Sequence, residues 1–359
     1  MPSVVSYHDQ RDVKNVQKLR KLQKELPVVC SGFFHSIAQT TSTLTRLAYA
    51  YDFKLFFGYL CSESPSFANK TPATILDTDF PLITGHDIEE YQDYLMQYIK
   101  TDHNGQTLMQ NHELGIMRKM SSIRSLFDYL YKNHIIPANV TTLVSLPKLH
   151  DKPILRLNPE EMKRMIDAAY TGEGLTERQQ KFRKFTGTRD YAIIMLFLGT
   201  GIRDSECVGI DIKDIDFTEN AFSVTRKGGN RVILYFPDAV AEALLEYLEE
   251  RKKIEALPGE ENALFLSIQR KRITQRAVQN MVKKYAAIAA PLKDRLSPHK
   301  LRSTFGTNLY LETGDIYLVA DVLGHSDVNT TRKHYADMTD SRRREAAKRT
   351  KLPDPDSKL

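Results

Sequence analysis

The chain has 359 residues, enough for about two domains, and its 41% hydrophobic and 27% charged residues are typical of a globular protein rather than a fibrous or disordered one. No stretch approaches the roughly 18 apolar residues of a membrane span, and the N-terminal residues lack the apolar segment of a signal peptide. Three widely spaced cysteines (Cys30, Cys61 and Cys207) form neither a disulfide framework nor a metal-binding pair. We therefore expect a cytoplasmic protein without a membrane partner.

The net charge of +6 is weak evidence for a polyanionic partner when taken alone. Residues 1–150 hold 15 basic and 14 acidic side chains, and residues 151–359 hold 36 and 31, so the surplus lies in the C-terminal part. It is most visible in the run Arg270-Lys271-Arg272 and in two further runs at 283–284 and 342–344. Each run taken singly fits a solvated helix face as well as a contact with phosphates.

The first part of the chain predicts helices. Thr41 or Ser42 can cap a helix in which aromatic and apolar residues between 49 and 60 recur at three- and four-residue spacing. Asp87 can cap a second helix over 88–99, and a third has an apolar stripe between 116 and 130. The opposite face of the third helix is basic, and it is either solvated or lies on phosphates; its residues include Arg118, Lys119 and Arg124.

Three prolines and no helical period mark residues 137–156 as an interdomain linker. A new helix then starts with Asn158 as N-cap, Pro159 at the first position and Glu161 completing a capping box. Residues 171–187 are polar and charged, and we expect a loop there. An apolar helix over 191–199 and a glycine turn at Thr200-Gly201 follow.

The clearest strand signal lies between residues 221 and 236. Two β-rich runs are joined by Lys227-Gly228-Gly229-Asn230, which predicts a hairpin. Further along, Asp238 is expected to cap a helix, 263–267 to form a short strand, and Thr274 to cap a long helix, with helices continuing to about residue 349. The second domain is therefore predicted to be mostly α with a small sheet.

Four separated pieces of the second domain form the candidate site. They are the segment TGIRDSE at 200–206, the hairpin lysine Lys227, the segment PHKLR at 298–302, and the segment LGH at 323–325 followed by Tyr335. Each has a plain structural alternative: Arg203 can pair with Glu206 one turn along a helix, and Gly324 can end a helix. His299 can belong to a capped helix start, and Lys227 to ordinary turn chemistry.

Together, the pieces resemble the tyrosine recombinases, the family of phage integrases and bacterial Xer proteins, over nearly the whole chain. The family pattern is TG-x-R-x-x-E, a hairpin lysine, H-x-L-R, LGH and a tyrosine. The resemblance implies six catalytic residues: Arg203, Lys227, His299, Arg302, His325 and Tyr335. It also implies a mainly α fold, with a helical N-terminal DNA-binding domain (a SAM-like core-binding domain) and a mixed α/β catalytic domain with a small antiparallel sheet.

These residue types also suit the chemistry of phosphodiester cleavage. Tyr335 can act as a covalent nucleophile, and Arg203 and Arg302 can offer bidentate forks to the phosphoryl oxygens, with His325 donating as well. Lys227 on a hairpin can protonate the leaving 5′-oxygen.

His299 can act as acid or base toward the tyrosine oxygen. No Asp/Glu cluster suggests a two-metal site, and none is needed if two arginines carry the charge. The resemblance implies a 3′-phosphotyrosyl intermediate that retains the bond energy, so neither ATP nor a metal nor another cofactor is expected.

Two positions depart from the more frequent family pattern. Nine residues after His325, the usual spacing, the chain has His334, and Tyr335 is the tenth. Family members with one additional residue that end in His-Tyr do occur, so Tyr335 remains the expected nucleophile, and Tyr310 and Tyr317 precede the LGH segment. Ser303 follows Arg302 where many relatives have histidine.

Within the family, the hairpin context from Val224 to Gly229, the long N-terminal extension and the segment from Tyr51 to Leu60 resemble the single-protein XerS type, which resolves chromosome dimers at one dif-like site. A mobile-element integrase would share every catalytic residue, and a non-catalytic DNA-binding protein of the same fold is the alternative of another class. The expected partners are double-stranded DNA, three further copies in a tetramer, and a DNA-translocase motor as a candidate. The candidate DNA-binding residues are Arg118, Lys119, Arg124, Arg270, Lys271 and Arg272.

The expected domain layout follows from the linker and the resemblance. It comprises a helical extension (1–35), a core-binding domain that grasps DNA (36–136), a linker (137–157), the catalytic domain (158–345) and a tail (346–359). After Tyr335 the sequence predicts a short helix with alanines on one side, which ends before two prolines. Such a helix has little apolar surface of its own, so it is expected to dock on a neighbouring subunit; the alternative is that it folds back on its own domain.

Overall fold

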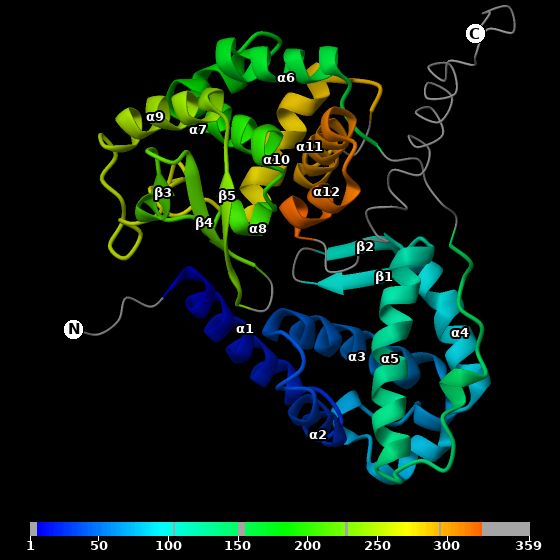
Figure 1. The fold of residues 1–359 in the computed structure, drawn as a ribbon. Coiled ribbons are helices and arrows are strands. Elements are labelled where there is room, and N and C mark those ends of the chain that lie inside the picture. Colours follow the sequence, from blue (N-terminus) through cyan, green and yellow to red (C-terminus); the bar gives the residue numbers. More distant parts are fainter. Residues whose placement is uncertain (1–5, 103–104, 150–154, 227–228, 294–295, 325–359) are drawn as a thin grey trace, which may run out of the picture. The chain divides into compact units, whose positions relative to one another are not determined.

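The computed structural model describes residues 6–102, 105–149, 155–226, 229–293 and 296–324 (Figure 1). The chain forms two compact units that divide between residues 152 and 153. The described residues are mainly helical, as the sequence predicted, and they include two small antiparallel sheets, of which the sequence predicted only the one in the second unit. No helix in this part of the chain has the length and apolar character needed to cross a membrane.

The first unit is a group of helices with one hairpin. Its α-helices are α1 (Tyr7–Gln23), α2 (Val29–Ser36), α3 (Thr43–Glu63), α4 (Gly85–Met96) and α5 (Glu113–Lys132). Short 3₁₀ helices are η1 (Pro65–Phe67), η2 (Pro72–Thr74), η3 (Asp77–Leu82) and η4 (Val140–Thr142). The strands β1 (Gln97–Asp102) and β2 (Gly105–Gln110) pair antiparallel, with Gln97 opposite Gln110.

The predicted apolar stripes form the core of this unit. Ser42 caps α3 by accepting a hydrogen bond from the Thr45 amide, and the aromatic residues of α3 pack against one another and against α2, α4 and α5. All five residues of the α5 stripe are buried: Ile116, Met120, Ile123, Phe127 and Leu130. Burial of this many large side chains, each worth about 1.5–3 kcal/mol, explains why α3 and α5 could be predicted from spacing alone.

The prediction for the second helix was wrong at both ends. Thr84, not Asp87, is the N-cap of α4, and Asp87 lies three residues later, where its carboxylate accepts from the Thr84 amide at 2.8 Å. The helix ends at Met96, because residues from Gln97 onward pair as β1. The partner strand β2 begins at Gly105, outside the segment with helical spacing, so that spacing did not reveal the pairing.

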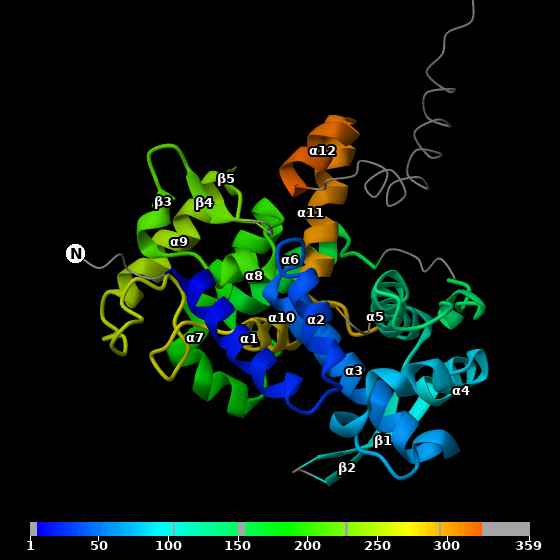
Figure 2. The ribbon, with the colours of Figure 1, turned by 90° about the horizontal axis from the view of Figure 1, so that it is seen from below.

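The second unit consists of helices and one three-stranded sheet. Its α-helices are α6 (Pro159–Thr171), α7 (Glu177–Thr200), α8 (Asp204–Cys207), α9 (Asp238–Arg251), α10 (Gln275–Ala289), α11 (Pro298–Thr313) and α12 (Ile316–Leu323). The 3₁₀ helix η5 (Ile212–Asp214) precedes the sheet, which consists of β3 (Ile215–Asp216), β4 (Ala221–Thr225) and β5 (Arg231–Tyr235) in the order β3-β4-β5. Figures 1 and 2 both show α11 and α12 (orange) side by side.

Several predicted boundaries of this unit are confirmed. Asn158, Pro159 and Glu161 form the expected N-terminus of α6, with the Glu161 amide donating to Asn158 at 2.8 Å. β4 and β5 form the predicted antiparallel hairpin, with Val224 opposite Val232. Thr274 caps α10 by accepting from the Ala277 amide.

Three other predictions for this unit were wrong. The expected loop over 171–187 is largely helix, because α7 begins at Glu177 with a capping box between Thr176 and Gln179, and its charged residues are good helix formers. Asp238 is the first residue of α9 rather than its cap, and its carboxylate instead accepts from Asn220. The expected strand at 263–267 makes only isolated bridges, at Ala263 and Leu266.

Candidate functional site

The glycine turn after α7 places Arg203. Gly201 adopts a left-handed conformation (φ +61°), and an added Cβ would lie 2.4 Å from the Phe305 ring, so only glycine fits this turn. Arg203 then becomes the N-cap of α8, and its amide donates to Glu206 at 3.0 Å. Its guanidinium Nη1 also pairs with Glu206 Oε1 at 2.8 Å, so the plain ion-pair alternative is realised.

That ion pair leaves the other end of the guanidinium free to reach a distant segment. Arg203 Nη2 donates to the carbonyl oxygen of Gly324 at 3.0 Å. Gly324 belongs to the LGH segment, 121 residues further along the chain. The structure therefore joins two of the four sequence motifs directly.

Arg302 joins the third motif to the same point. It lies in the second turn of α11 and is only 4% exposed. Its Nη1 donates to the carbonyl of Gly201 at 2.6 Å, and its Nη2 donates to the carbonyl of Leu323. One buried guanidinium thus bonds both to the turn that precedes Arg203 and to the end of α12.

The end of α12 is where these contacts meet. Gly324 caps the helix in a left-handed conformation (φ +60°), so the last carbonyls lack helical partners. Three successive carbonyls, of residues 322, 323 and 324, accept from Arg226, Arg302 and Arg203 respectively. Cations are favoured at a helix C-terminus by the helix dipole. We call these three side chains the arginine cluster.

Sequence reasoning missed Arg226 as a member of this cluster. It directly follows β4 in the hairpin, and its Nη2 donates to the Val322 carbonyl at 2.8 Å. Burial lowers its pKa, and so does the positive charge of Arg203, whereas the Glu206 carboxylate acts in the opposite direction. Its partner is 96 residues away, so no local sequence signal could identify this contact.

The remaining predicted catalytic residues are not brought together by the described structure. His299 is exposed at the second position of α11, one helical turn before Arg302. Lys227, His325 and Tyr335 lie outside the described residues. In the chain, Lys227 directly follows Arg226 of the arginine cluster, and His325 directly follows Gly324, whose carbonyl accepts from Arg203.

The predicted basic face of α5 has internal partners. Arg118 makes two 2.6 Å hydrogen bonds to the buried carboxylate of Asp52. Lys119 donates to Asn111 at 2.7 Å, and Arg124 donates to the Val144 carbonyl at 2.6 Å. In the absence of DNA, these three side chains therefore stabilise the first unit.

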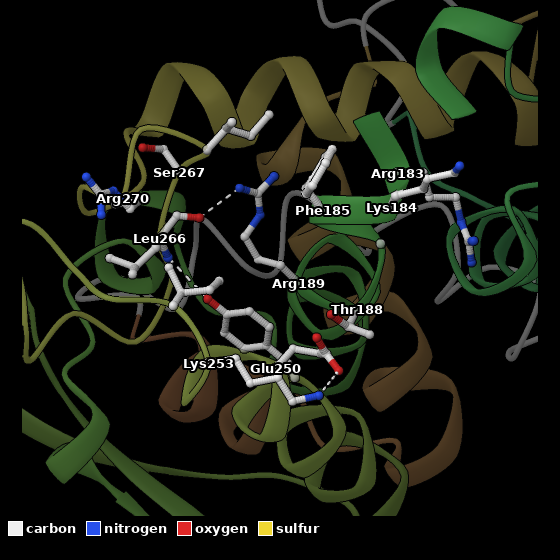
Figure 3. A pocket seen from close by; sticks show the side chains of 14 residues that line it. Arg183, Lys184, Phe185, Thr188, Arg189, Glu250, Lys253, Leu266, Ser267 and Arg270 are labelled. Atoms are coloured by element: carbon white, nitrogen blue, oxygen red, sulfur yellow. Dashed lines mark hydrogen bonds and ion pairs between the residues drawn. The ribbon is translucent and has the colours of Figure 1, made fainter. Parts of the chain in front are cut away.

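The predicted basic run at 270–272 is divided in the structure. Arg272 is held by Asp211 at 2.5 Å and by two carbonyls, whereas Lys271 is exposed and Arg270 lies 3.8 Å from Glu255. Arg270 also lines a pocket of about 420 Å³ between α7 and α9 (Figure 3). Arg189 extends across this pocket to the Leu266 carbonyl at 2.7 Å. None of the arginine cluster lines it.

The chain is similar to known proteins along most of its length. The model of the phage integrase family matches residues 156–342. The tyrosine recombinase XerC of Caldanaerobacter subterraneus is 34% identical over 324 residues, which cover 89% of this chain and 85% of that protein.

Two solved structures show the same fold at lower sequence identity. XerH bound to a palindromic difH substrate has a TM-score of 0.64 at 20% identity, covering 86% of this chain and 81% of that one. The Tn1549 transposon integrase in complex with circular intermediate DNA has a TM-score of 0.62 at 20% identity, covering 89% and 98%. The family match and the XerC relative show that the chain belongs to the phage integrase family, and that it is a site-specific DNA recombinase of the tyrosine type.

Proposed function

We propose that the chain cleaves and rejoins DNA through a 3′-phosphotyrosyl intermediate formed by Tyr335. The observation that carries the proposal is the meeting of Arg203 and Arg302, 99 positions apart in sequence, on adjacent carbonyls at the end of α12. Two guanidinium groups held so close together provide a strong site for a phosphoryl group. The buried carboxylate of Glu206 orients one of them.

The reaction then needs two proton transfers and one displacement. The Tyr335 oxygen attacks the phosphorus and loses its proton to His299, while the bond to the 5′-oxygen breaks and that oxygen takes a proton from Lys227. Arg203, Arg302 and His325 stabilise the charge of the pentacoordinate transition state. Attack by the 5′-hydroxyl of the partner strand reverses these transfers and seals the exchanged DNA.

The assignment of Tyr335 is tested with a nicked suicide substrate, which traps the covalent protein–DNA adduct. Tyr335→Phe is expected to abolish the adduct while DNA affinity stays unchanged, because only the nucleophilic oxygen is lost. His334→Ala is the matched control at the competing position, and it should still form the adduct. An adduct that persists in Tyr335→Phe, or that maps to another tyrosine, contradicts the assignment.

We further propose that the biological reaction is resolution of chromosome dimers at a single dif-like site, by this protein alone as in the XerS type. The XerC relative, which covers most of the chain, supports an Xer role. The alternative, a mobile-element integrase, is supported by the fold likeness to the Tn1549 integrase. Mapping the chromosomal sites occupied by Tyr335→Phe separates the two. One site in the replication terminus supports dimer resolution, and sites at the ends of an integrated element contradict it.

Exchange between two duplexes requires four cleavages, so we propose a tetramer on DNA in which residues 341–359 contact a neighbouring subunit. Deletion of these residues is expected to leave binding to a single site nearly unchanged and to impair cooperative binding and recombination. Gel shifts with one-site and two-site DNA measure both. Full recombination by the truncated protein would contradict the coupling role.

A requirement for a translocase motor is tested by recombination of a two-site plasmid with the purified chain alone.

A further inference from the structure

Arg226 connects two elements that the proposed reaction uses, although it has no role in that reaction. It extends from the end of β4 to the last turn of α12, where it donates to the Val322 carbonyl. A Cβ added to Gly324 would lie 2.0 Å from Arg226 Nη1 and 2.3 Å from its Cζ. The guanidinium therefore lies against backbone that only a glycine leaves open.

This is a costly place for a cation. The Nε of Arg226 is buried without a hydrogen-bond partner, and a buried donor that makes no hydrogen bond destabilises the folded state. The positive charge of Arg203 disfavours the charged form of Arg226, and the negative charges of Glu206 and Asp321 offset burial and this repulsion only in part. Packing alone does not account for an arginine here, because an apolar side chain would avoid both costs.

The contacts also indicate which element depends on Arg226. The last turn of α12 is bonded to Arg203 and Arg302 as well, so it remains attached when Arg226 is lost. Arg226, by contrast, belongs to the hairpin: its amide donates to the Asn230 carbonyl at 2.8 Å, and its carbonyl accepts from the Gly229 amide at 3.1 Å. Loss of its side chain therefore releases the hairpin from α12 rather than α12 from the site.

We propose that Arg226 is a positioning residue: it fastens the hairpin to the C-terminal turn of α12, and efficient proton donation by the next residue in the chain, Lys227, depends on this attachment. The inference rests on the proposed function, in which Lys227 protonates the leaving 5′-oxygen. Arg226 itself touches neither the substrate nor the proton in this scheme.

The test measures single-turnover cleavage of two suicide substrates by the full-length chain. One has an ordinary 5′-bridging oxygen, and the other has a 5′-bridging sulfur, which leaves as a thiolate without needing a proton. Arg226→Gln is expected to cleave the oxygen substrate about 10- to 100-fold more slowly, the cost of misplacing a catalytic group. It should cleave the sulfur substrate at nearly the wild-type rate. Equal slowing on both substrates, or no slowing on either, would overturn the inference.

Two further variants separate the possible failures. Lys227→Ala should lose about 100- to 10,000-fold on the oxygen substrate, the range of a general acid, and should be rescued by sulfur. If it is not rescued, the acid assignment falls and the inference falls with it. If Lys227→Ala is rescued and Arg226→Gln is not, the inference alone fails.

Arg231→Gln is the matched control for charge. Arg231 lies on the other strand of the same hairpin, and its guanidinium pairs with Asp214, which belongs to η5, at 2.8 Å. Its loss makes the same change in net charge, and it should leave cleavage of both substrates unchanged. The pattern expected for Arg226→Gln, if found in Arg231→Gln, would show that hairpin charge rather than attachment to α12 matters.

Discussion

Glu206 is the buried carboxylate next to the arginine cluster, and it holds Arg203 together with the Gly324 carbonyl. It accepts from both the amide and the guanidinium of Arg203. Removing one partner of a buried pair costs about 3–5 kcal/mol, and the partial exposure of Arg203 reduces that figure. The charge of this one residue therefore contributes both to stability and to the geometry of the site.

Glu206→Gln is expected to lower the free energy of unfolding by about 1–3 kcal/mol, because the amide places a donor against the guanidinium. The measurement is urea unfolding of the full-length chain. Glu249→Gln is the control, since Glu249 forms an exposed pair with Lys252, and solvent screens such pairs so that they contribute little to stability. Equal effects of the two changes would show that Glu206 is no more than a surface charge.

Glu161 shows how a predicted cap contributes to stability at a particular pH. Burial by itself raises the pKa of its carboxyl, but hydrogen bonds from Lys293, at 2.6 Å, and from the Asn158 amide outweigh burial and hold the pKa below its usual value. A depressed pKa in the folded state adds stability above the unfolded pKa of about 4.3, and this stability is lost as the pH falls through the folded pKa.

Glu161→Gln should therefore be less stable than the wild type at pH 7, and the difference should narrow as the pH falls below about 4. Urea midpoints at several pH values measure this difference. Glu160→Gln makes the same charge change at an exposed position of the same turn and serves as the control. A Glu161→Gln difference that stays constant across this pH range would contradict a role for the ionised carboxylate.

At the scale of elements, the contact between α7 and α9 depends on a missing side chain. A Cβ at Gly199 would lie 2.5 Å from Cγ2 of Val240, which is buried. Glycine is a poor helix former, yet here, in the last turn of α7, it allows the two helices to approach. Through this contact, the first turn of α9 packs against the last turn of α7, which leads directly into the glycine turn before Arg203.

Gly199→Ala is expected to destabilise the wild type by about 1–3 kcal/mol through overpacking. In a Val240→Ala background, the same change should be neutral or stabilising, because the clash is removed and the helix gains propensity. Thermal unfolding of the four variants in this cycle gives the coupling. Additive effects would mean that the two residues do not restrict each other.

The sequence predicted those elements whose signals are local. The apolar stripes of α3 and α5, the capping box at Asn158 and the β4–β5 hairpin depend on residues close together in the chain, and each was found. The start of α7 also has a local signal, the capping box of Thr176 and Gln179, but the many charged residues of this segment favoured the interpretation as a loop.

The arrangement of the site could be predicted only in part. The motifs gave Arg203 and Arg302, but their hydrogen bonds run to backbone carbonyls more than 20 and 100 residues away. Backbone acceptors are present at every position, so they have no residue-specific signal. The same reason explains why Arg226 was missed, and why the basic face of α5 was not recognised as bonded to Asp52, Asn111 and Val144.

At the scale of the whole molecule, the two units raise the question of whether both hold DNA. If phosphate contacts come from both, log K should fall steeply and linearly with log salt, and the fragment 153–359 should bind more weakly with a shallower slope. Fluorescence anisotropy at several salt concentrations gives both slopes. Identical slopes for the fragment and the full chain would exclude a DNA-grasping role for the first unit.

The attachment of three arginines to successive carbonyls of α12 has a consequence for how this chain can vary. A carbonyl oxygen is present whatever the side chain, so the identities of Val322 and Leu323 are not set by their bonds to Arg226 and Arg302. A mutational scan would find position 322 tolerant even though one of its atoms anchors the hairpin. The scan would detect these bonds only through substitutions of the arginines themselves, and through substitutions of Gly324, where an added methyl group would meet Arg226.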